Sequence, residues 1–271
     1  MTKIACQTIV FGNSTIKENL AEYAGTIKNA GYDGVETGAR FFDYDRPGYY
    51  RDLYARLDLK LVALHLGGDF LNRDSVKQQI DDVKKTIQFG KELGCPYINL
   101  SGFYKNDKTP QDYVTESESY IEIGKACNDE GLKLCFHNHY WEFLNNGEGI
   151  KILLDKVPEE LMSLVLDVGW AEQGGVSSLQ FLREYIGRVE TLHIKDYTKI
   201  GVPAGTVSDH VTEMGTGVMP LEEIYDFITS RRSDWWIIIE HDQTQKEVSK
   251  VIRQNCDYLR SLERRKQYGN A

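Results

Sequence analysis

Four stretches of the chain end an apolar run in a side chain that can bind a metal ion or transfer a proton. The first, LKLCFHNHYWEF at residues 132–143, leads into His137, His139 and Glu142. The other three, LVLD, ETLHIKD and WWIIIEHD, supply Asp167, His193 and Glu240. Desolvating such groups is costly unless they bind or catalyse something. The repeated pattern therefore predicts a site of metal or acid–base chemistry.

Eight short apolar segments are predicted to be the strands that position these groups. They are residues 3–10, 34–36, 59–66, 97–100, 132–138, 163–167, 189–194 and 236–240. Amphipathic helical patterns lie between them, as in residues 75–93. Eight such units without a linker predict a single-domain (β/α)8 TIM barrel over residues 1–271. A doubly wound open sheet is the alternative, but no GxGxxG loop follows the first strand.

Catalytic groups in a TIM barrel lie at the carboxyl ends of the strands. The candidate residues all fall at such ends, and they are Glu36, His65, His137, His139, Asp167, His193 and Glu240. The strand starts carry easily solvated side chains instead, namely Lys3, Lys60, Lys133 and Arg188. This asymmetry indicates one functional site at one end of the barrel.

Carboxylates combined with imidazoles suit one divalent ion, such as Mn²⁺, Co²⁺, Zn²⁺ or Mg²⁺. We expect Asp167, His193 and Glu240 to be ligands. Glu142 is the expected fourth ligand, with His137 and His139 as alternatives. Each residue taken alone has a structural explanation, because a strand-end His is often only hydrogen-bonded and an Asp often caps a turn. Four such tips together favour the metal.

Substrate contacts are expected from residues at or just beyond the strand tips. Glu36 and His65 are polar candidates, and the aromatic faces of Trp141 and Trp170 can stack on a sugar ring. Lys195, followed by Asp196, offers either a cation for the substrate or a surface ion pair. The loop at residues 215–217, Gly-Thr-Gly, is a further candidate, although a lone GxG is weak evidence for phosphate binding.

Composition restricts the partners. Acidic residues outnumber basic ones by 41 to 32, giving a net charge of −9, which disfavours nucleic acid. The five cysteines lack CxxC spacing and indicate buried free thiols in a reducing compartment. Neither a membrane span nor a signal peptide is evident. We therefore expect a cytoplasmic protein acting on a small molecule, without a membrane partner; homo-oligomerisation stays open.

The ordered motifs GYDGVE, LGCPYINLSG, GLKLCFHNHYWEF, LVLDVGW, VETLHIKDY, GTG and IIIEHD resemble the xylose isomerase-like TIM-barrel superfamily. The resemblance covers nearly the whole chain. It implies one divalent metal held by Glu, Asp, His and Glu, and Asp167, His193 and Glu240 match directly. Members isomerise or epimerise sugars, or dehydrate keto-inositols, by removing a proton α to a metal-polarised carbonyl.

Two positions depart from the superfamily pattern. The fifth strand carries His137 and His139 where ketose 3-epimerases have a ligand glutamate, and this HNH form is more similar to the inosose dehydratase branch. The DxxH pattern of the DNA-repair endonuclease branch reads Asp167 to Trp170 here, and Trp cannot ligate zinc. The first departure raises the chance of a His base and a β-elimination, and the second disfavours an endonuclease.

The favoured function is therefore a metal-dependent isomerase or epimerase acting on a sugar or keto-sugar. Its base would be a glutamate, Glu142 or Glu240, or a histidine, His137 or His139. The alternative is a metal-dependent lyase, either a keto-inositol dehydratase or an enzyme of keto-glycoside β-elimination. An AP-endonuclease-like nuclease and a non-catalytic sugar-binding barrel are less favoured, and the latter predicts no metal.

Overall fold

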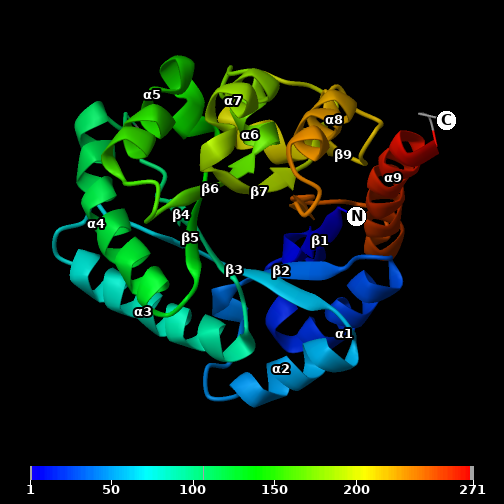
Figure 1. Cartoon of the computed structure of the whole chain (residues 1–271), viewed down its shortest axis with the longest axis horizontal. Helices are drawn as coiled ribbons and strands as arrows, with labels where there is room; N and C mark the ends of the chain where they lie inside the picture. The colour runs from blue at the N-terminus through cyan, green and yellow to red at the C-terminus, as the bar shows by residue number, and fades with distance from the viewer. Residues whose placement is uncertain (1, 106, 269–271) are drawn as a thin grey trace.

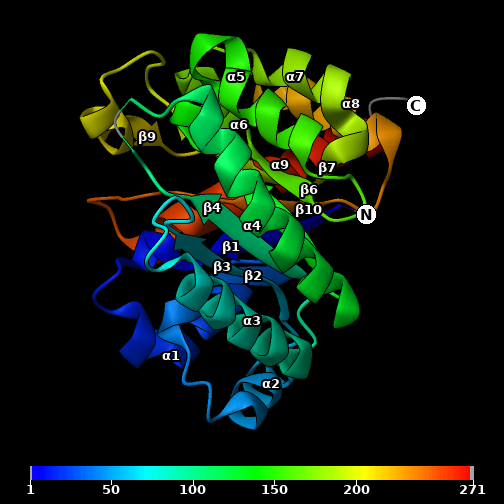
Figure 2. The ribbon, with the colours of Figure 1, turned by 90° about the vertical axis from the view of Figure 1, so that its left-hand side faces the viewer.

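The computed structural model describes residues 2–105 and 107–268. Eight parallel strands close into a barrel in the order β1-β10-β7-β6-β5-β4-β3-β2, and helices surround it (Figures 1 and 2). The barrel strands are β1 (Lys3–Gln7), β2 (Gly34–Gly38), β3 (Lys60–Gly68), β4 (Tyr97–Gly102), β5 (Lys133–His137), β6 (Ser163–Asp167), β7 (Val189–Ile194) and β10 (Trp236–Ile239). The predicted TIM barrel is confirmed, and the open-sheet alternative is wrong.

The helices follow the strands in chain order around the barrel. They are α1 (Ile16–Asn29), α2 (Pro47–Arg56), α3 (Val76–Leu93), α4 (Pro110–Asp129), α5 (Tyr140–Lys156), α6 (Val168–Gln173), α7 (Ser178–Tyr185), α8 (Leu221–Arg231) and α9 (Val248–Tyr268). Short 3-10 turns are η1 (Thr8–Phe11), η2 (Ala39–Phe41), η3 (Ile186–Arg188) and η4 (Ala204–His210). A small antiparallel hairpin, β8 (Asp196–Tyr197) and β9 (Val211–Thr212), lies in the connection between β7 and α8.

Small and branched side chains fill the inside of the barrel. Ala5, Val62, Cys135, Val165 and Ile238 are fully buried and form a cluster separate from the larger core between strands and helices. Strands covered on both faces need apolar residues on both sides, which explains their near-continuous apolar sequences. Because the interior is packed, polar side chains are placed at the strand ends, where a TIM barrel carries its active site.

The strand boundaries agree with the predicted ones to within about two residues, except at the end of the first strand. Residues 163–167 and 189–194 are strands as predicted. The first strand ends at Gln7 rather than Val10, because the Gln7 side chain accepts a hydrogen bond from the Ile9 amide and starts η1. Helix α3 buries Ile80 and Ile87 as its pattern predicts and ends at Gly94, which has a φ of 66°.

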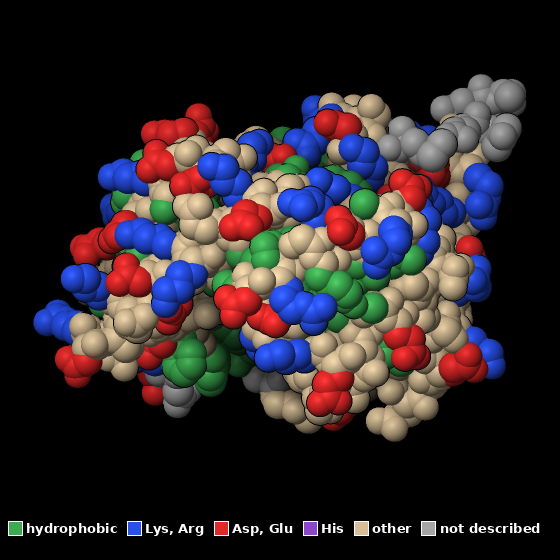
Figure 3. All heavy atoms as spheres, turned by 90° about the horizontal axis from the view of Figure 1, so that it is seen from below, with side chains coloured by type: hydrophobic (Ala, Val, Ile, Leu, Met, Phe, Trp, Pro, Cys, Tyr) green, Lys and Arg blue, Asp and Glu red, His purple; other side chains and the backbone are tan. Residues whose placement is uncertain are grey.

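Three further features are the polarity of the helices, the state of the cysteines and the distribution of surface charge. Among the described helices, none has the length and apolar character needed to cross a bilayer. The five cysteines are buried and unpaired, as predicted. On the face seen in Figure 3, acidic and basic side chains are interspersed, so this face carries no extended basic stripe of the kind that tracks a phosphate backbone.

Candidate metal centre

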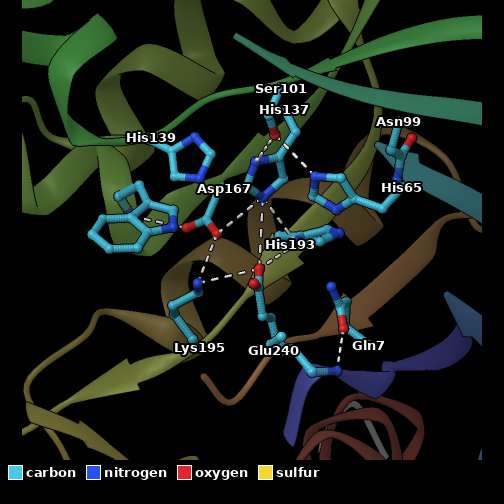
Figure 4. Close-up of polar contacts among 12 residues, drawn as sticks. Gln7, His65, Asn99, Ser101, His137, His139, Asp167, His193, Lys195 and Glu240 are labelled. Carbon is cyan, nitrogen blue, oxygen red and sulfur yellow. Dashed lines mark hydrogen bonds and ion pairs between the residues drawn. The ribbon is translucent and has the colours of Figure 1, made fainter. Parts of the chain in front are cut away.

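Four buried side chains from neighbouring strands converge at the mouth of the barrel (Figure 4). His137 ends β5, Asp167 ends β6, His193 lies in β7 and Glu240 follows β10. One ligand atom of each lies within 4.8 Å of the others. Because β5, β6, β7 and β10 are adjacent in the barrel, their ends bring these four residues together.

The donor set of this group fits a divalent metal ion. Two imidazole nitrogens and two carboxylate oxygens are ligands that zinc, cobalt and manganese accept. His137 Nε2 lies 3.5 Å from Asp167 Oδ2 and 3.6 Å from Glu240 Oε2. Asp167 Oδ2 is buried and makes no aligned hydrogen bond within the described residues, so its lone pairs are open to a metal ion although the Lys195 ammonium lies 3.0 Å away.

The Lys195 ammonium lies against the same carboxylates. Its Nζ is 3.0 Å from Asp167 Oδ2, 3.2 Å from Glu240 Oε2 and 3.4 Å from Asp242 Oδ1, and the side chain is fully buried. Burial opposes the charge on Lys195, but Asp167 and the other carboxylates outweigh it and raise the pKa of Lys195 well above its usual value. Burial likewise opposes the charge on Glu240, yet Lys195 and His193 hold the pKa of Glu240 well below its usual value. Lys195 is therefore a buried cation of the site and not part of a surface ion pair.

Glu36 orients the His193 ring by contacting the ring nitrogen that faces away from Glu240. Glu36 Oε2 lies 2.9 Å from His193 Nε2, while His193 Nδ1 faces Glu240 Oε2 at 2.5 Å. Asn99 Nδ2 donates to Glu36 Oε2 at 2.5 Å. Burial opposes the imidazolium, but Glu36 and Glu240 outweigh it and raise the pKa of His193 to about 10. A carboxylate behind a ligating histidine fixes which ring nitrogen faces the metal.

A second chain of contacts links Glu36 to His137. Glu36 Oε1 lies 2.9 Å from His65 Nδ1, His65 Nε2 lies 2.9 Å from Ser101 Oγ, and Ser101 Oγ lies 3.2 Å from His137 Nδ1. Burial lowers the pKa of His65. The structure thus places Glu36 and His65, which the sequence assigns to substrate binding, in contact with the two histidines of the group.

His139 lies beside the group and outside it. Its ring stacks on Trp141 at 4.2 Å and 6°, and lies 5.0 Å from the His137 ring and 5.6 Å from the Trp170 ring. Its Nδ1 is buried and has no hydrogen-bond partner in the described part of the chain. Burial is the main cause that keeps the pKa of His139 well below its usual value, so the imidazole is neutral at pH 7. The two predicted tryptophans flank this imidazole.

Glu142 lies apart from the four-residue group, contrary to its prediction as the fourth ligand. It is in the first turn of α5, where its Oε2 accepts a hydrogen bond from the His139 backbone N–H at 2.8 Å. Its Oε1 is buried without a partner among the described residues, and burial raises the pKa of Glu142 to about 8. His137, one of the alternatives from the sequence, takes the fourth position.

The sequence reasoning missed three supporting residues, Ser101, Asn138 and Asp242. Asn138 exchanges two hydrogen bonds with the backbone of Asp167, at 2.9 and 3.0 Å, and so ties the ends of β5 and β6 together. Ser101 contacts two imidazoles, and Asp242 is a further carboxylate for Lys195. Each is a polar residue at or just past a strand tip, so the signal that found the other residues also marks these.

Comparison with known proteins agrees with this fold. The family model for the xylose isomerase-like TIM barrel matches residues 25–262. Inosose dehydratase 2 of Bacillus cereus is 25% identical in an alignment 240 residues long that covers 79% of this chain and 79% of that protein.

Two solved structures share the fold. An L-ribulose 3-epimerase has a TM-score of 0.78 at 15% identity, covering 100% of this chain and 99% of its own. The IOLI protein with a bound zinc atom has a TM-score of 0.76 at 17% identity, covering 96% and 97%. The match of the family model over most of the chain confirms the resemblance found in the sequence: this protein belongs to the xylose isomerase-like TIM-barrel family.

Proposed function

We propose that this protein is a divalent-metal-dependent enzyme that removes the proton α to the carbonyl of a sugar or keto-sugar. The observation that carries the proposal is the buried group of His137, Asp167, His193 and Glu240, with the His139 imidazole beside it, whose Nδ1 has no hydrogen-bond partner among the described residues. A site for this chemistry needs an electrophile for the carbonyl oxygen and a positioned base for the carbon-bound proton.

The four residues of the group would hold the metal. When bound, a divalent ion supplies a Lewis acid that polarises a carbonyl oxygen. Two imidazoles favour zinc, cobalt or manganese over magnesium. The zinc atom bound by the IOLI neighbour supports metal binding in this fold.

His139 is the proposed base. The nitrogens of His137 and His193 face the group, and the Glu240 carboxylate is held by His193 and Lys195. The His139 ring is neutral, and its stacking on Trp141 fixes its orientation. Lys195 would stabilise the negative charge that develops on a substrate oxygen, because a buried ammonium acts strongly on a charge close to it.

Elimination is the outcome that the site supports best. Proton removal is common to elimination and isomerisation, but a symmetrical two-glutamate epimerase needs a second glutamate in the group. Glu142 is bound to the His139 amide, so Glu240 is the one glutamate of the four-residue group. Loss of a β-hydroxyl group, as in a dehydratase, needs no such second carboxylate. The name of the Bacillus cereus relative, inosose dehydratase, supports this choice.

Isomerisation or epimerisation is the second candidate. Lys195 is a second proton-carrying group that contacts the carboxylates of the site, and it can return a proton to a neighbouring position. Both candidates begin with removal of the α-proton, and reprotonation of the enolate from solvent exchanges that proton.

NMR of keto-inositols and ketoses incubated with the metal-loaded protein in D2O tests the proposal. We expect deuterium at the α-carbon of the recovered substrate. Elimination also gives an unsaturated dehydrated product whose former α-carbon carries no hydrogen, and the second candidate gives a deuterated epimer or isomer. The variant His139→Asn should keep its metal and lose exchange by at least roughly 100-fold, the range of general-base catalysis. Equal exchange in this variant would exclude His139 as the base.

A further inference from the structure

The Asp196 carboxylate is enclosed by backbone amides of the connection between β7 and α8. Its Oδ2 accepts hydrogen bonds from the amides of Gly215 and Gly217, each at 2.9 Å. Its Oδ1 accepts from the amides of Tyr197 at 2.9 Å and Met219 at 3.1 Å. The residue is 1% exposed, so this carboxylate is removed from solvent and solvated by the backbone.

The two glycines allow the backbone to approach this closely. A Cβ at Gly217 would lie 2.3 Å from Asp196 Oδ1, and a Cβ at Gly215 would lie 2.2 Å from the Tyr258 ring. Gly215 also has a φ of 80°, which favours glycine. Convergent backbone amides just before a helix form a cradle for an anion. In this protein the cradle is built around a carboxylate of the same chain.

The location of the cradle affects whether the protein can bind a phosphorylated substrate. TIM-barrel enzymes frequently bind phosphate groups in the loops after the seventh and eighth strands and at the N-terminus of a nearby helix. The seventh barrel strand here is β7, and the cradle lies between it and α8, which starts at Leu221. The cradle therefore lies in one of the two loops that receive a phosphate in other TIM barrels, and Asp196 occupies it.

The charges around the mouth of the barrel also disfavour the binding of a phosphate group. Asp167, Glu240 and Asp242 surround the single ammonium of Lys195. Further lysines of the mouth loops are paired with carboxylates of this chain, namely Lys105 with Asp112 at 2.8 Å, Lys108 with Glu116 at 2.6 Å and Lys246 with Glu213 at 2.7 Å. Before a divalent ion binds, a phosphate dianion brought to this region would meet like charges, and like-charge contacts weaken binding.

We propose that Asp196 acts as an internal anion that fills the phosphate position, and that the substrate is an uncharged, unphosphorylated sugar or keto-cyclitol. The part that concerns the substrate rests on the proposed function. The exclusion of phosphate from the cradle is a property of the loop and stands without it.

Titration with inorganic phosphate, followed by ³¹P NMR, tests the exclusion directly. We expect no saturable binding to the wild-type protein. The variant Asp196→Gly frees the amides of the cradle and should gain saturable binding. The matched control is Asp209→Gly, which removes an exposed carboxylate of the same connection that contacts Gln243, and it should behave as the wild type. Saturable phosphate binding by the wild type, lost on Gly217→Ala, would overturn the proposal.

A comparison of a free sugar with its phosphate ester tests the part of the proposal that concerns the substrate, even if Asp196→Gly does not fold. A free ketose or keto-cyclitol should have a kcat/KM at least tenfold above that of its phosphate ester. The reverse order would refute the inference while leaving the proposed function intact. If neither is turned over, the proposed function fails, and the phosphate titration still decides whether the cradle excludes anions.

Discussion

Lys195 Nζ lies 3.0 Å from Asp167 Oδ2, and both side chains are fully buried. The same oxygen belongs to the group that fits a divalent metal, as does Glu240 Oε2 at 3.2 Å from the ammonium. Two cations that use the same oxygens must compete for them. The charge of Lys195 therefore balances the carboxylates without metal and opposes the ion when it binds.

Replacement of Lys195 by Met should separate these two effects. Without metal, Lys195→Met leaves buried carboxylates uncompensated and should destabilise the protein by roughly 3–5 kcal/mol. With the competitor removed, affinity for a divalent ion should rise, so that metal increases the melting temperature more than in the wild type. Thermal unfolding with and without metal measures both. Lys246→Met, which removes an exposed lysine from its pair with the buried Glu213 carboxylate, is the control. An equal metal-induced shift in Lys195→Met and wild type would show that Lys195 does not compete with the ion.

Metal affinity distinguishes His137 from Glu142 as the fourth ligand. His137→Gln should weaken metal binding at least tenfold, because it removes a nitrogen from the four-atom group. Glu142→Gln should leave metal affinity unchanged, because this side chain binds the His139 amide instead. Titration against a chelating dye measures both affinities. The opposite result would restore Glu142 as the ligand.

Glu36 is predicted to act through His193. Glu36→Gln removes the carboxylate that holds His193 Nε2, and loss of such an outer partner typically costs about 10–100-fold in metal affinity. Glu190→Gln is a matched control, because Glu190 also binds side chains of two strands, Tyr97 and Lys133, away from the four-residue group. Isothermal titration of both variants with zinc checks the difference. Equal affinities would remove Glu36 from the site.

Glu142 should make stability depend on pH. Its pKa is raised from 4.5 to about 8 by burial, so the folded state keeps its proton over a window in which the unfolded state loses it. The unfolded state then binds fewer protons, and stability must fall as pH rises from about 4.5 to 8. Each pKa unit corresponds to about 1.4 kcal/mol, so the loss is on the order of a few kcal/mol.

Glu142→Gln should remove that loss. The neutral amide can still accept the hydrogen bond from His139, so the stability of the variant relative to wild type should rise between pH 5 and pH 8.5. Urea unfolding at the two pH values measures the difference, and Glu222→Gln, an exposed change in α8, is the control. A difference that does not change with pH would show that Glu142 is not held protonated.

The strand tips were predictable because the apolar runs of a barrel end abruptly at its mouth. Asp167, His193 and Glu240 each follow such a run, and adjacency in the barrel then brings them together. Closure of the barrel can be predicted from the number of βα units, without knowing which strands pair. The anchoring of the Gly-Thr-Gly loop by Asp196 was not visible, because the partners are about twenty residues apart and meet only through the fold.

A local feature of the sequence explains why Glu142 lies apart from the four-residue group. α5 starts at Tyr140, immediately after His139, which places Glu142 in the first helical turn. A carboxylate at this position tends to bind the free amide of the residue before the helix. His139 is not a usual capping residue, so the start of this helix cannot be located from the sequence.

The most direct test of the central claim is α-proton exchange in D2O with metal-stripped protein to which zinc, cobalt or manganese is added stepwise. We predict no exchange in the stripped protein and full exchange at one equivalent of metal, with no recovery in Asp167→Asn or His193→Gln. Exchange that is equally fast in the stripped protein would contradict a metal-dependent enolising enzyme.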